Sequence, residues 1–143
     1  MLSLVKEAKI TRVSNAVAAG TSDVNCTSVD MSGFDAVAFI ASIGTITATA
    51  VTSIKIQGSS DNSTFVDLES TSITIAEGDS NEIFIPEVLR PSYRYIRAVI
   101  DRGTANCVID GVVAIQHTPR YSPVTQPSGT NVEVNVAPAA GTA

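Results

Sequence analysis

The stretch SYRYIRAVIDRGTANCVIDGVVAIQH, residues 92–117, decides the fold class of this chain. Apolar and polar residues alternate on both sides of the short polar segment RGTAN, a pattern that is typical of two antiparallel strands joined by a loop. We therefore expect a β-hairpin here. Gly111 lies in phase with the apolar side of the second strand, which predicts a bulge or the close approach of another backbone. The in-phase apolar residues are Ile96, Ala98 and Ile100 on the first strand, and Ile109, Val113 and Ile115 on the second.

A second decisive stretch, FDAVAFIASIG at residues 34–44, is apolar on both of its alternating faces. Such a run predicts a central strand that is covered on both sides. The small alanines suit a surface that another layer or another subunit approaches closely. One face carries Val37, Phe39, Ala41 and Ile43, and the other carries Ala36, Ala38 and Ile40.

Outward from these two stretches, further strands are expected at residues 10–19, 23–31 and 51–60. The turn signal SSDNS predicts a hairpin over residues 54–69, with Asp and Asn side chains bonding the local backbone. A second hairpin is expected over residues 72–89 around EGDSN. In that hairpin Ile73 and Ile75 would pair in phase with Ile83 and Ile85.

The composition agrees with strands, because Val and Ile together number 31 while Leu numbers 4. Eight or nine short strands without a helical pattern predict an all-β fold. We expect a single antiparallel β-sandwich or jelly-roll-like domain. It would extend over residues 10–118, with an extended N-terminal arm at 1–9 and an extended C-terminal tail at 119–143.

The tail contains one short alternating patch, NVEVNV at residues 131–136, with Val132, Val134 and Val136 on one side. Alone, this patch cannot offset the entropy of ordering it. Two alternatives remain open: the tail is disordered, or the patch adds as a strand to the sheet edge of a partner.

Charge and hydropathy exclude several function classes. The net charge is −5, and the nine Lys and Arg residues do not cluster in the sequence, so no nucleic-acid partner is expected. A basic amphipathic stretch, a secretory signal and a long apolar run are all missing, so no membrane partner is expected either.

The residue inventory predicts that the chain is not an enzyme and holds no cofactor or metal. His117 is the only histidine, which leaves a metal site or a hydrolytic triad without partners. Cys26 and Cys107 are expected to be small buried residues, with a disulfide as the alternative. Arg97 and Arg102 are expected to form exposed pairs with nearby acids. Those acids are Asp67, Glu69, Asp101 and Asp110.

The segments SVDMSGFDAVAFIA, SSDNSTFVDL and RYIRAVIDRGTANCVIDG resemble a family of small structural proteins of tailed bacteriophages and prophages, encoded near the major capsid protein. The resemblance covers about residues 10–125. It implies a capsid decoration, or cement, protein that binds the outer surface of the head and bridges capsomers. It also implies synthesis in the host bacterial cytoplasm and a final place in the virion.

The partners that this resemblance implies are the major capsid protein and further copies of the chain, with a trimer favoured. Position and pattern point to five contact residues. An alternative is a phage tail or fibre component, or a head–tail joining component, with a glycan-binding type of β-sandwich. Tyr93 and Tyr95 share a parity and are the aromatic residues that such a site would use, although packing beneath a loop is the plainer interpretation. The candidate contact residues are Arg120, Tyr121, Val132, Val134 and Val136.

Overall fold

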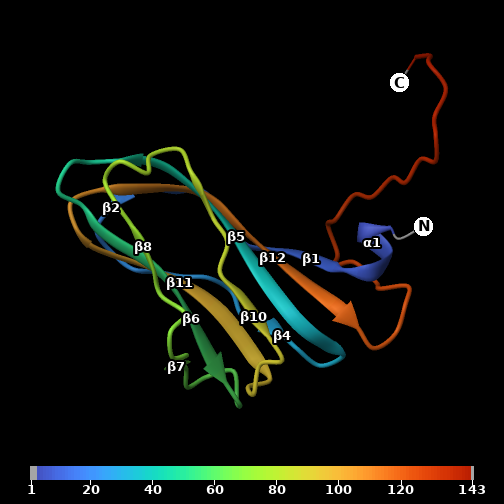
Figure 1. Cartoon of the computed structure of the whole chain (residues 1–143), viewed down its shortest axis with the longest axis horizontal. Helices are drawn as coiled ribbons and strands as arrows, with labels where there is room; N and C mark the ends of the chain where they lie inside the picture. The colour runs from blue at the N-terminus through green and yellow to red at the C-terminus, as the bar shows by residue number, and fades with distance from the viewer. Residues whose placement is uncertain (1–2, 143) are drawn as a thin grey trace.

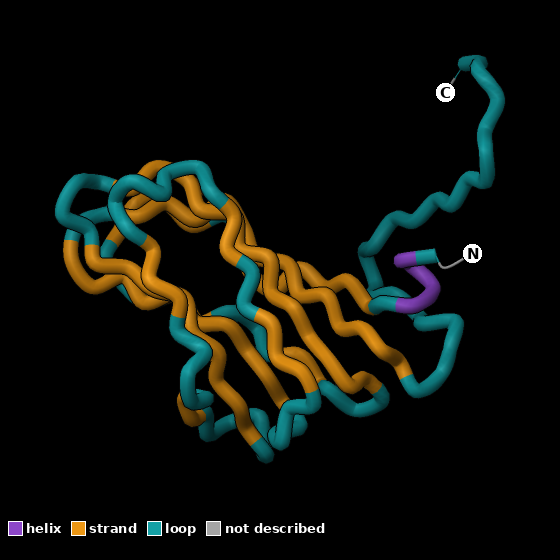
Figure 2. The backbone as a smooth tube through the Cα atoms, viewed as in Figure 1, coloured by secondary structure: helices purple, strands orange, loops and turns teal. Residues whose placement is uncertain are grey.

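A computed structural model describes residues 3–142 of the chain. It consists of two antiparallel β-sheets packed face to face, with one helical turn, α1 (Leu4–Glu7), before the first strand. Figure 2 shows the strands gathered in one body, from which the C-terminal segment leaves as an extended loop. The expected all-β, antiparallel sandwich is confirmed.

We call the two sheets A and B. In sheet A the order is β1–β12–β5–β10, with β2 also against β12 and β9 against β5. In sheet B the order is β3–β11–β6–β7, with β4 also against β11 and β8 against β6. The strands of sheet A are β1 (Lys9–Ser14), β2 (Val17–Gly20), β5 (Phe34–Ile46), β9 (Ile83–Phe84), β10 (Glu87–Leu89) and β12 (Cys107–Pro119). The strands of sheet B are β3 (Val24–Asn25), β4 (Val29–Asp30), β6 (Val51–Ser59), β7 (Val66–Asp67), β8 (Ile73–Ile75) and β11 (Tyr95–Thr104).

The hydrophobic core lies between the inner faces of the two sheets, where alternate residues of each long strand are fully buried. Burying an aliphatic or aromatic side chain of this size contributes about 1.5–3 kcal/mol, so these residues supply most of the drive to fold. Truncating the central ring, Phe39→Ala, costs about 3–5 kcal/mol by this measure. The largest of these side chains include Phe39, Ile43, Ile54, Ile56, Ile96, Ile100 and Ile109.

The hairpin expected over residues 92–117 is wrong in its pairing. β11 pairs with β6 in sheet B, whereas β12 pairs with β5 and β1 in sheet A. The short connection at residues 105–106 carries the chain from one sheet to the other, with Ala105 in a left-handed conformation at φ 57°. A hairpin and a pair of strands in opposite sheets both require apolar and polar residues to alternate, because in each case one side of both strands faces the core.

The hairpin expected over residues 72–89 is also wrong, because its two strands lie in different sheets. Ile73 and Ile75 lie in β8 and pair with β6 in sheet B. Ile83 lies in β9 and pairs with β5 in sheet A. The hairpin over residues 54–69 does form, because β6 pairs with β7.

Gly111 marks a bulge, as expected, with register shifts on both sides of Ile109 and a positive φ of 154°. Ser14 O lies 3.5 Å from the position of a Cβ at Gly111, so another backbone also approaches closely. A bulge moves the following residues to the opposite face. Ile109 therefore points into the core, whereas Val113 and Ile115 lie on the outer face of sheet A, contrary to their expected common side.

The expected exposure of Arg102 is wrong, and the expected burial of Cys26 and Cys107 is confirmed. Arg102 is 5% exposed and not a surface ion pair; its guanidinium donates to the carbonyl oxygens of Ala18, Ser22 and Cys107 at 2.7–2.9 Å. Cys26 and Cys107 are buried and free. Burial raises the pKa of the Cys26 thiol to about 11.

Candidate interaction surfaces

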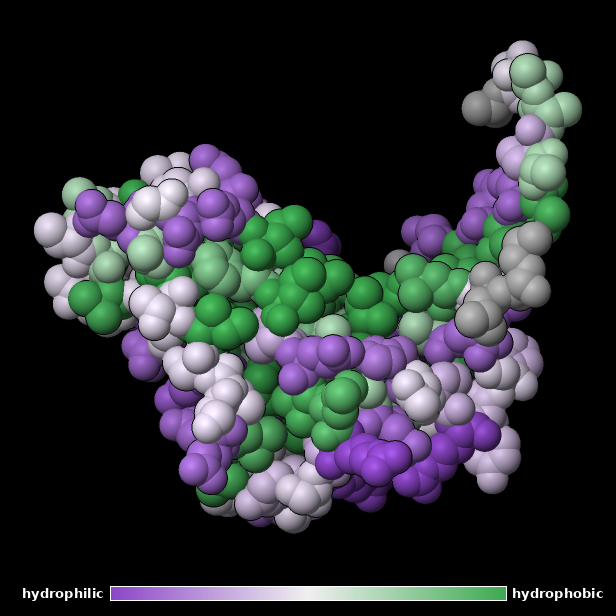
Figure 3. All heavy atoms as spheres, viewed as in Figure 1, coloured by the Kyte–Doolittle hydropathy of each residue, from purple (hydrophilic) through white to green (hydrophobic). Residues whose placement is uncertain are grey.

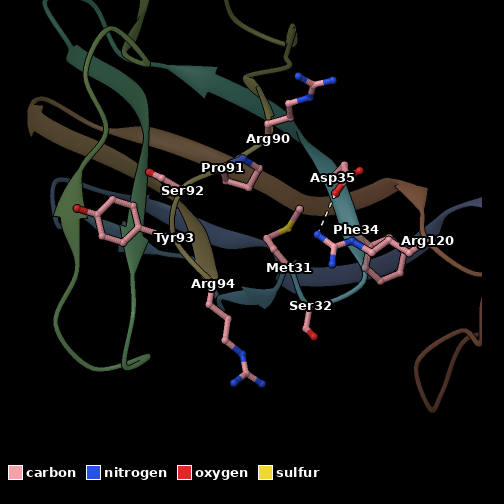
Figure 4. Close-up of a pocket in the computed structure, with 10 residues that line it drawn as sticks. All are labelled: Met31, Ser32, Phe34, Asp35, Arg90, Pro91, Ser92, Tyr93, Arg94 and Arg120. Carbon is pink, nitrogen blue, oxygen red and sulfur yellow. Dashed lines mark hydrogen bonds and ion pairs between the residues drawn. The ribbon is translucent and has the colours of Figure 1, made fainter.

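One end of the sandwich carries a recess of about 630 Å³, between the loop before β5, the loop before β11 and the end of β12. Figure 4 shows Met31, Phe34 and Pro91 among its lining residues. Three arginines, Arg90, Arg94 and Arg120, also line the recess. We call this region the loop end.

The three arginines of the loop end differ in their ion pairs. Arg94 binds both carboxylate oxygens of Asp30, with the shortest contact at 2.8 Å, and this hydrogen bond lowers the pKa of Asp30. Arg120 Nη2 lies 3.5 Å from Asp35 Oδ1. Among residues 3–142, Arg90 has no carboxylate in ion-pair contact.

The guanidinium groups of Arg90 and Arg94 point out of the recess in opposite directions (Figure 4). They do not converge on one point, so the recess is not built around a single small anion. Spread in this way, the arginines suit a broad contact with a larger charged surface.

The segment after β12 is anchored to the N-terminal arm by a residue that sequence analysis did not single out. The Gln126 side-chain amide donates to Val5 O at 2.7 Å and to Ala8 O at 2.6 Å, and its carbonyl oxygen accepts from Ile10 N at 3.0 Å. Val124 N also donates to Lys6 O at 2.8 Å. Nothing local in the sequence marks Gln126, because its partners lie more than 100 residues away.

The predicted contact residues lie in two separate groups. Arg120 and Tyr121 lie at the loop end, where Tyr121 is 86% exposed beside a second, smaller recess that Phe34 also lines. Val132, Val134 and Val136 lie on the tail beyond the anchored segment, with 47%, 47% and 70% of their surface exposed. The structure does not bring the two groups together.

The tail beyond residue 128 is extended and stands clear of the sandwich (Figure 1). The Asn135 side chain donates to Glu133 Oε1 at 3.0 Å, which places these two polar side chains on the same side of the tail. In an extended chain the alternate residues point the other way. The tail therefore has an apolar side formed by the three valines.

The outer face of sheet A is largely apolar. Register places Ile40 beside Val113, and Ala38 beside Ile115, on this face, and the latter row continues to Ile10. These residues are half-buried, whereas Ala36 on the same face is 3% exposed. The expected covering of β5 on both sides is therefore met on the inner side and only in part on the outer side. The remaining members of the face are Ala36, Ile83 and Leu89, with the polar residues Arg12, Ser42, Glu87 and His117.

Figure 3 shows hydrophobic side chains in a band across the molecule, over the positions of β5, β12 and β1 in Figure 1. By contrast, the outer face of sheet B is mainly polar. There Arg97 donates to Gln57 and lies over the ring of Phe65, while Lys55 pairs with Asp67 at 2.9 Å. The two sheets thus present different chemistry to their surroundings.

His117 lies on the outer face of sheet A, with its Nε2 atom 2.7 Å from Glu87 Oε1. Within residues 3–142, no group of three His, Cys, Asp or Glu side chains is placed to hold a metal ion. In the same part of the chain, no helix has the length and apolar character needed to cross a membrane.

Comparisons with known proteins give one informative likeness. No protein-family model matches the chain, and no curated protein matches it. Among solved structures, the crystal structure of the PBSX exported protein XepA aligns with a TM-score of 0.55 at 17% sequence identity. The alignment covers 96% of this chain and 46% of XepA, so the chain spans about half the length of that protein. At this identity the likeness concerns the fold.

Proposed function

We propose that the chain is a capsid decoration protein of a tailed bacteriophage or prophage. In this proposal it binds the outer surface of the head, contacts the major capsid protein and stabilises the shell by bridging capsomers. Copies of the chain form a closed homo-oligomer, with three as the favoured number, because closed symmetry lets one surface patch be used repeatedly.

The observation that carries this proposal is the character of the loop end. The chain has a net charge of −5, yet three of its nine basic residues, Arg90, Arg94 and Arg120, line one recess. Tyr121 stands exposed beside them. Arg94 and Arg120 pair with carboxylates, so the excess positive charge of this loop-built surface comes from Arg90. Such a surface on an acidic protein is suited to docking on an acidic surface of a larger partner.

The phage assignment is supported by two independent likenesses. Segments of the sequence resemble structural proteins encoded near the major capsid protein, and the fold is similar to that of XepA, a PBSX protein. The fold likeness to this PBSX exported protein supports an association with phages, and the position on the head is part of our proposal.

The proposal is tested with heads assembled from the major capsid protein of the phage or prophage that carries this chain. We expect the purified chain to co-sediment with these heads and to protect them against heat. Arg90→Glu should weaken binding at least tenfold without breaking an ion pair, because Arg90 has no carboxylate partner within residues 3–142. Added salt should weaken binding of the unaltered chain. Lys55→Glu, on the outer face of sheet B, is the control and should bind normally. Failure of the unaltered chain to bind heads would contradict the proposal.

A second candidate, a glycan-binding tail or fibre component, is favoured by one feature of the same recess. The ring of Tyr93 lines it together with Ser92 and Asp35, and a partly exposed ring beside polar groups suits a sugar. Titration with oligosaccharides from the host cell surface separates the two functions. Saturable binding that Tyr93→Ala abolishes, without binding to heads, would favour this candidate. A ring of six or twelve copies would instead indicate a head–tail joining component.

A further inference from the structure

We propose that the tail of one copy packs its valines onto the outer face of sheet A of a neighbouring copy, so that exchanged tails hold the oligomer together. The inference rests on the proposed function only in that copies of the chain associate. It divides the predicted contact residues: Arg120 and Tyr121 remain for the larger partner, and the tail valines bind another copy.

The receiving surface is the outer face of sheet A, which is only half-buried in a single chain. Ala38, Ile40, Val113 and Ile115 form adjoining apolar rows across β5 and β12, and all four are half-buried. Ile83 and Leu89 extend this surface at the β9–β10 edge and are 61% and 66% exposed. Contiguous exposed apolar surface of this kind marks an interaction site on a protein whose other sheet is polar outside.

The tail has the complementary form. Its valines share one side, while Glu133 and Asn135 bond to each other on the opposite side. Side chains two residues apart in an extended segment repeat at roughly 6.6 Å, which is also the repeat along the strands of the face. Val132, Val134 and Val136 can therefore enter between successive rows while the polar side stays in water.

The anchoring of the tail favours a neighbouring copy over the chain's own face. Gln126 and Val124 fix the root of the tail to the N-terminal arm. Beyond them a turn, in which Thr130 N donates to Pro127 O at 3.2 Å and Gly129 has φ 85°, starts the segment that stands clear of the body (Figures 1 and 3). Residues 128–142 reach roughly 50 Å when extended, which is enough to cross to an adjacent copy.

The area needed for a stable assembly also favours reciprocal exchange. A specific interface buries about 800 Å² on each partner, more than three valines provide. In a closed ring each copy donates one tail and receives another, so every copy takes part in two such contacts. Each contact that has formed strengthens the others, because it raises the local concentration of the remaining tails and faces.

Light scattering of the purified full chain tests the exchange. We expect an oligomer that Val134→Asp or Ile115→Asp converts to monomers, with the circular-dichroism spectrum of Val134→Asp the same as that of the unaltered chain. Val66→Asp is the matched control, because Val66 is 44% exposed on sheet B, close to the 47% of Val134. This variant should remain oligomeric. A monomeric full chain, or an oligomer that survives Val134→Asp, overturns the inference.

Disulfide trapping identifies the receiving surface and does not depend on the folding of Ile115→Asp. Val134→Cys is mixed with a differently tagged chain that carries Ile40→Cys or Ile115→Cys, and the mixture is oxidised in air. The native cysteines are buried and should not compete. We expect a linked pair of chains. No linkage at either position, or a link within one chain when both cysteines are on it, overturns the exchange.

The two proposals fail separately. An oligomer that is linked through its tails but does not bind heads refutes only the decoration function. Monomers that still bind heads refute the tail exchange and the closed homo-oligomer, and leave the binding to heads standing.

Discussion

At the scale of single residues, Gly58 shows how closely the loop end is packed. A Cβ at Gly58 would lie 2.6 Å from Tyr93 Cδ2 and 2.9 Å from Tyr93 Cβ. The clash includes the root of the tyrosine side chain, so a rotamer change alone cannot relieve it. We expect Gly58→Ala to lower the free energy of unfolding by about 1–3 kcal/mol in urea titrations. Gly78→Ala, where no atom lies within 4 Å, should change it by no more than about 0.5 kcal/mol.

The turn at Asp61 predicts a defined dependence of stability on acid. Asp61 Oδ1 accepts hydrogen bonds from Ser63 N at 2.9 Å, Thr64 N at 2.8 Å and Ser59 Oγ at 2.8 Å. Bonding from Thr64 N, then Ser63 N, lowers the pKa of Asp61 to about 2. A lowered carboxylate pKa stabilises the fold above the ordinary pKa, near 4, and that contribution is lost as the pH falls towards 2.

Urea titrations between pH 5 and pH 2 measure this contribution. Asp61→Asn should remove part of the acid sensitivity, while Asp110→Asn, which alters an exposed carboxylate without a hydrogen bond among the described residues, should keep it. Equal acid profiles for the unaltered chain and Asp61→Asn would contradict the assignment.

Residue chemistry could be predicted from the sequence where the cause is local. The SSDNS turn signal predicted side-chain bonds to the nearby backbone, and Asp61 makes them. Arg102 could not be placed in this way, because the carbonyl oxygens that it binds come from a distant part of the chain: Ala18 lies in β2 and Ser22 in the bend after it. The neighbouring sequence does not distinguish a buried arginine from an exposed one.

At the scale of elements, alternation located the strands and did not determine their partners. β11 and β12 show the apolar period of a hairpin, yet they face each other across the core in different sheets. The alternation of apolar residues shows which side of a strand is buried. A hairpin and the observed pairing in two sheets bury the same side of each strand. The bulge at Gly111 was visible in the sequence, whereas its effect, moving Val113 and Ile115 outward, required the register.

The anchored root of the tail gives a prediction at the same scale. At dilutions where the unaltered chain is also monomeric, removing residues 128–143 should leave the thermal unfolding midpoint unchanged, because the described part of this segment lacks buried residues in the single chain. Removing residues 119–143 should lower the midpoint by several degrees, because the bonds of Gln126 and Val124 to the N-terminal arm are lost. Hydrogen exchange at Ile10 N, which donates to Gln126, should speed up in the shorter chain and in Gln126→Ala. Equal midpoints for both truncations would show that the root is not anchored.

At the scale of the whole molecule, the chain combines a rigid sandwich with three distinct surfaces. The loop end carries three arginines, the outer face of sheet A is largely apolar, and the tail is amphipathic. Pattern and position in the sequence single out the tail valines and Arg120 as candidate contacts, and their role in contacts stays a prediction. It could not predict the apolar face, because that face is assembled from strands that are far apart along the chain.

Cryo-electron microscopy of intact particles of the phage to which we propose this chain belongs tests the central claim most directly. The account predicts density for the sandwich on the outer surface of the head, at symmetry-related positions, with the loop end against the major capsid protein and the tails reaching neighbouring copies. Heads without this density, with the protein recovered only from the medium or from the tail of the particle, would contradict the account.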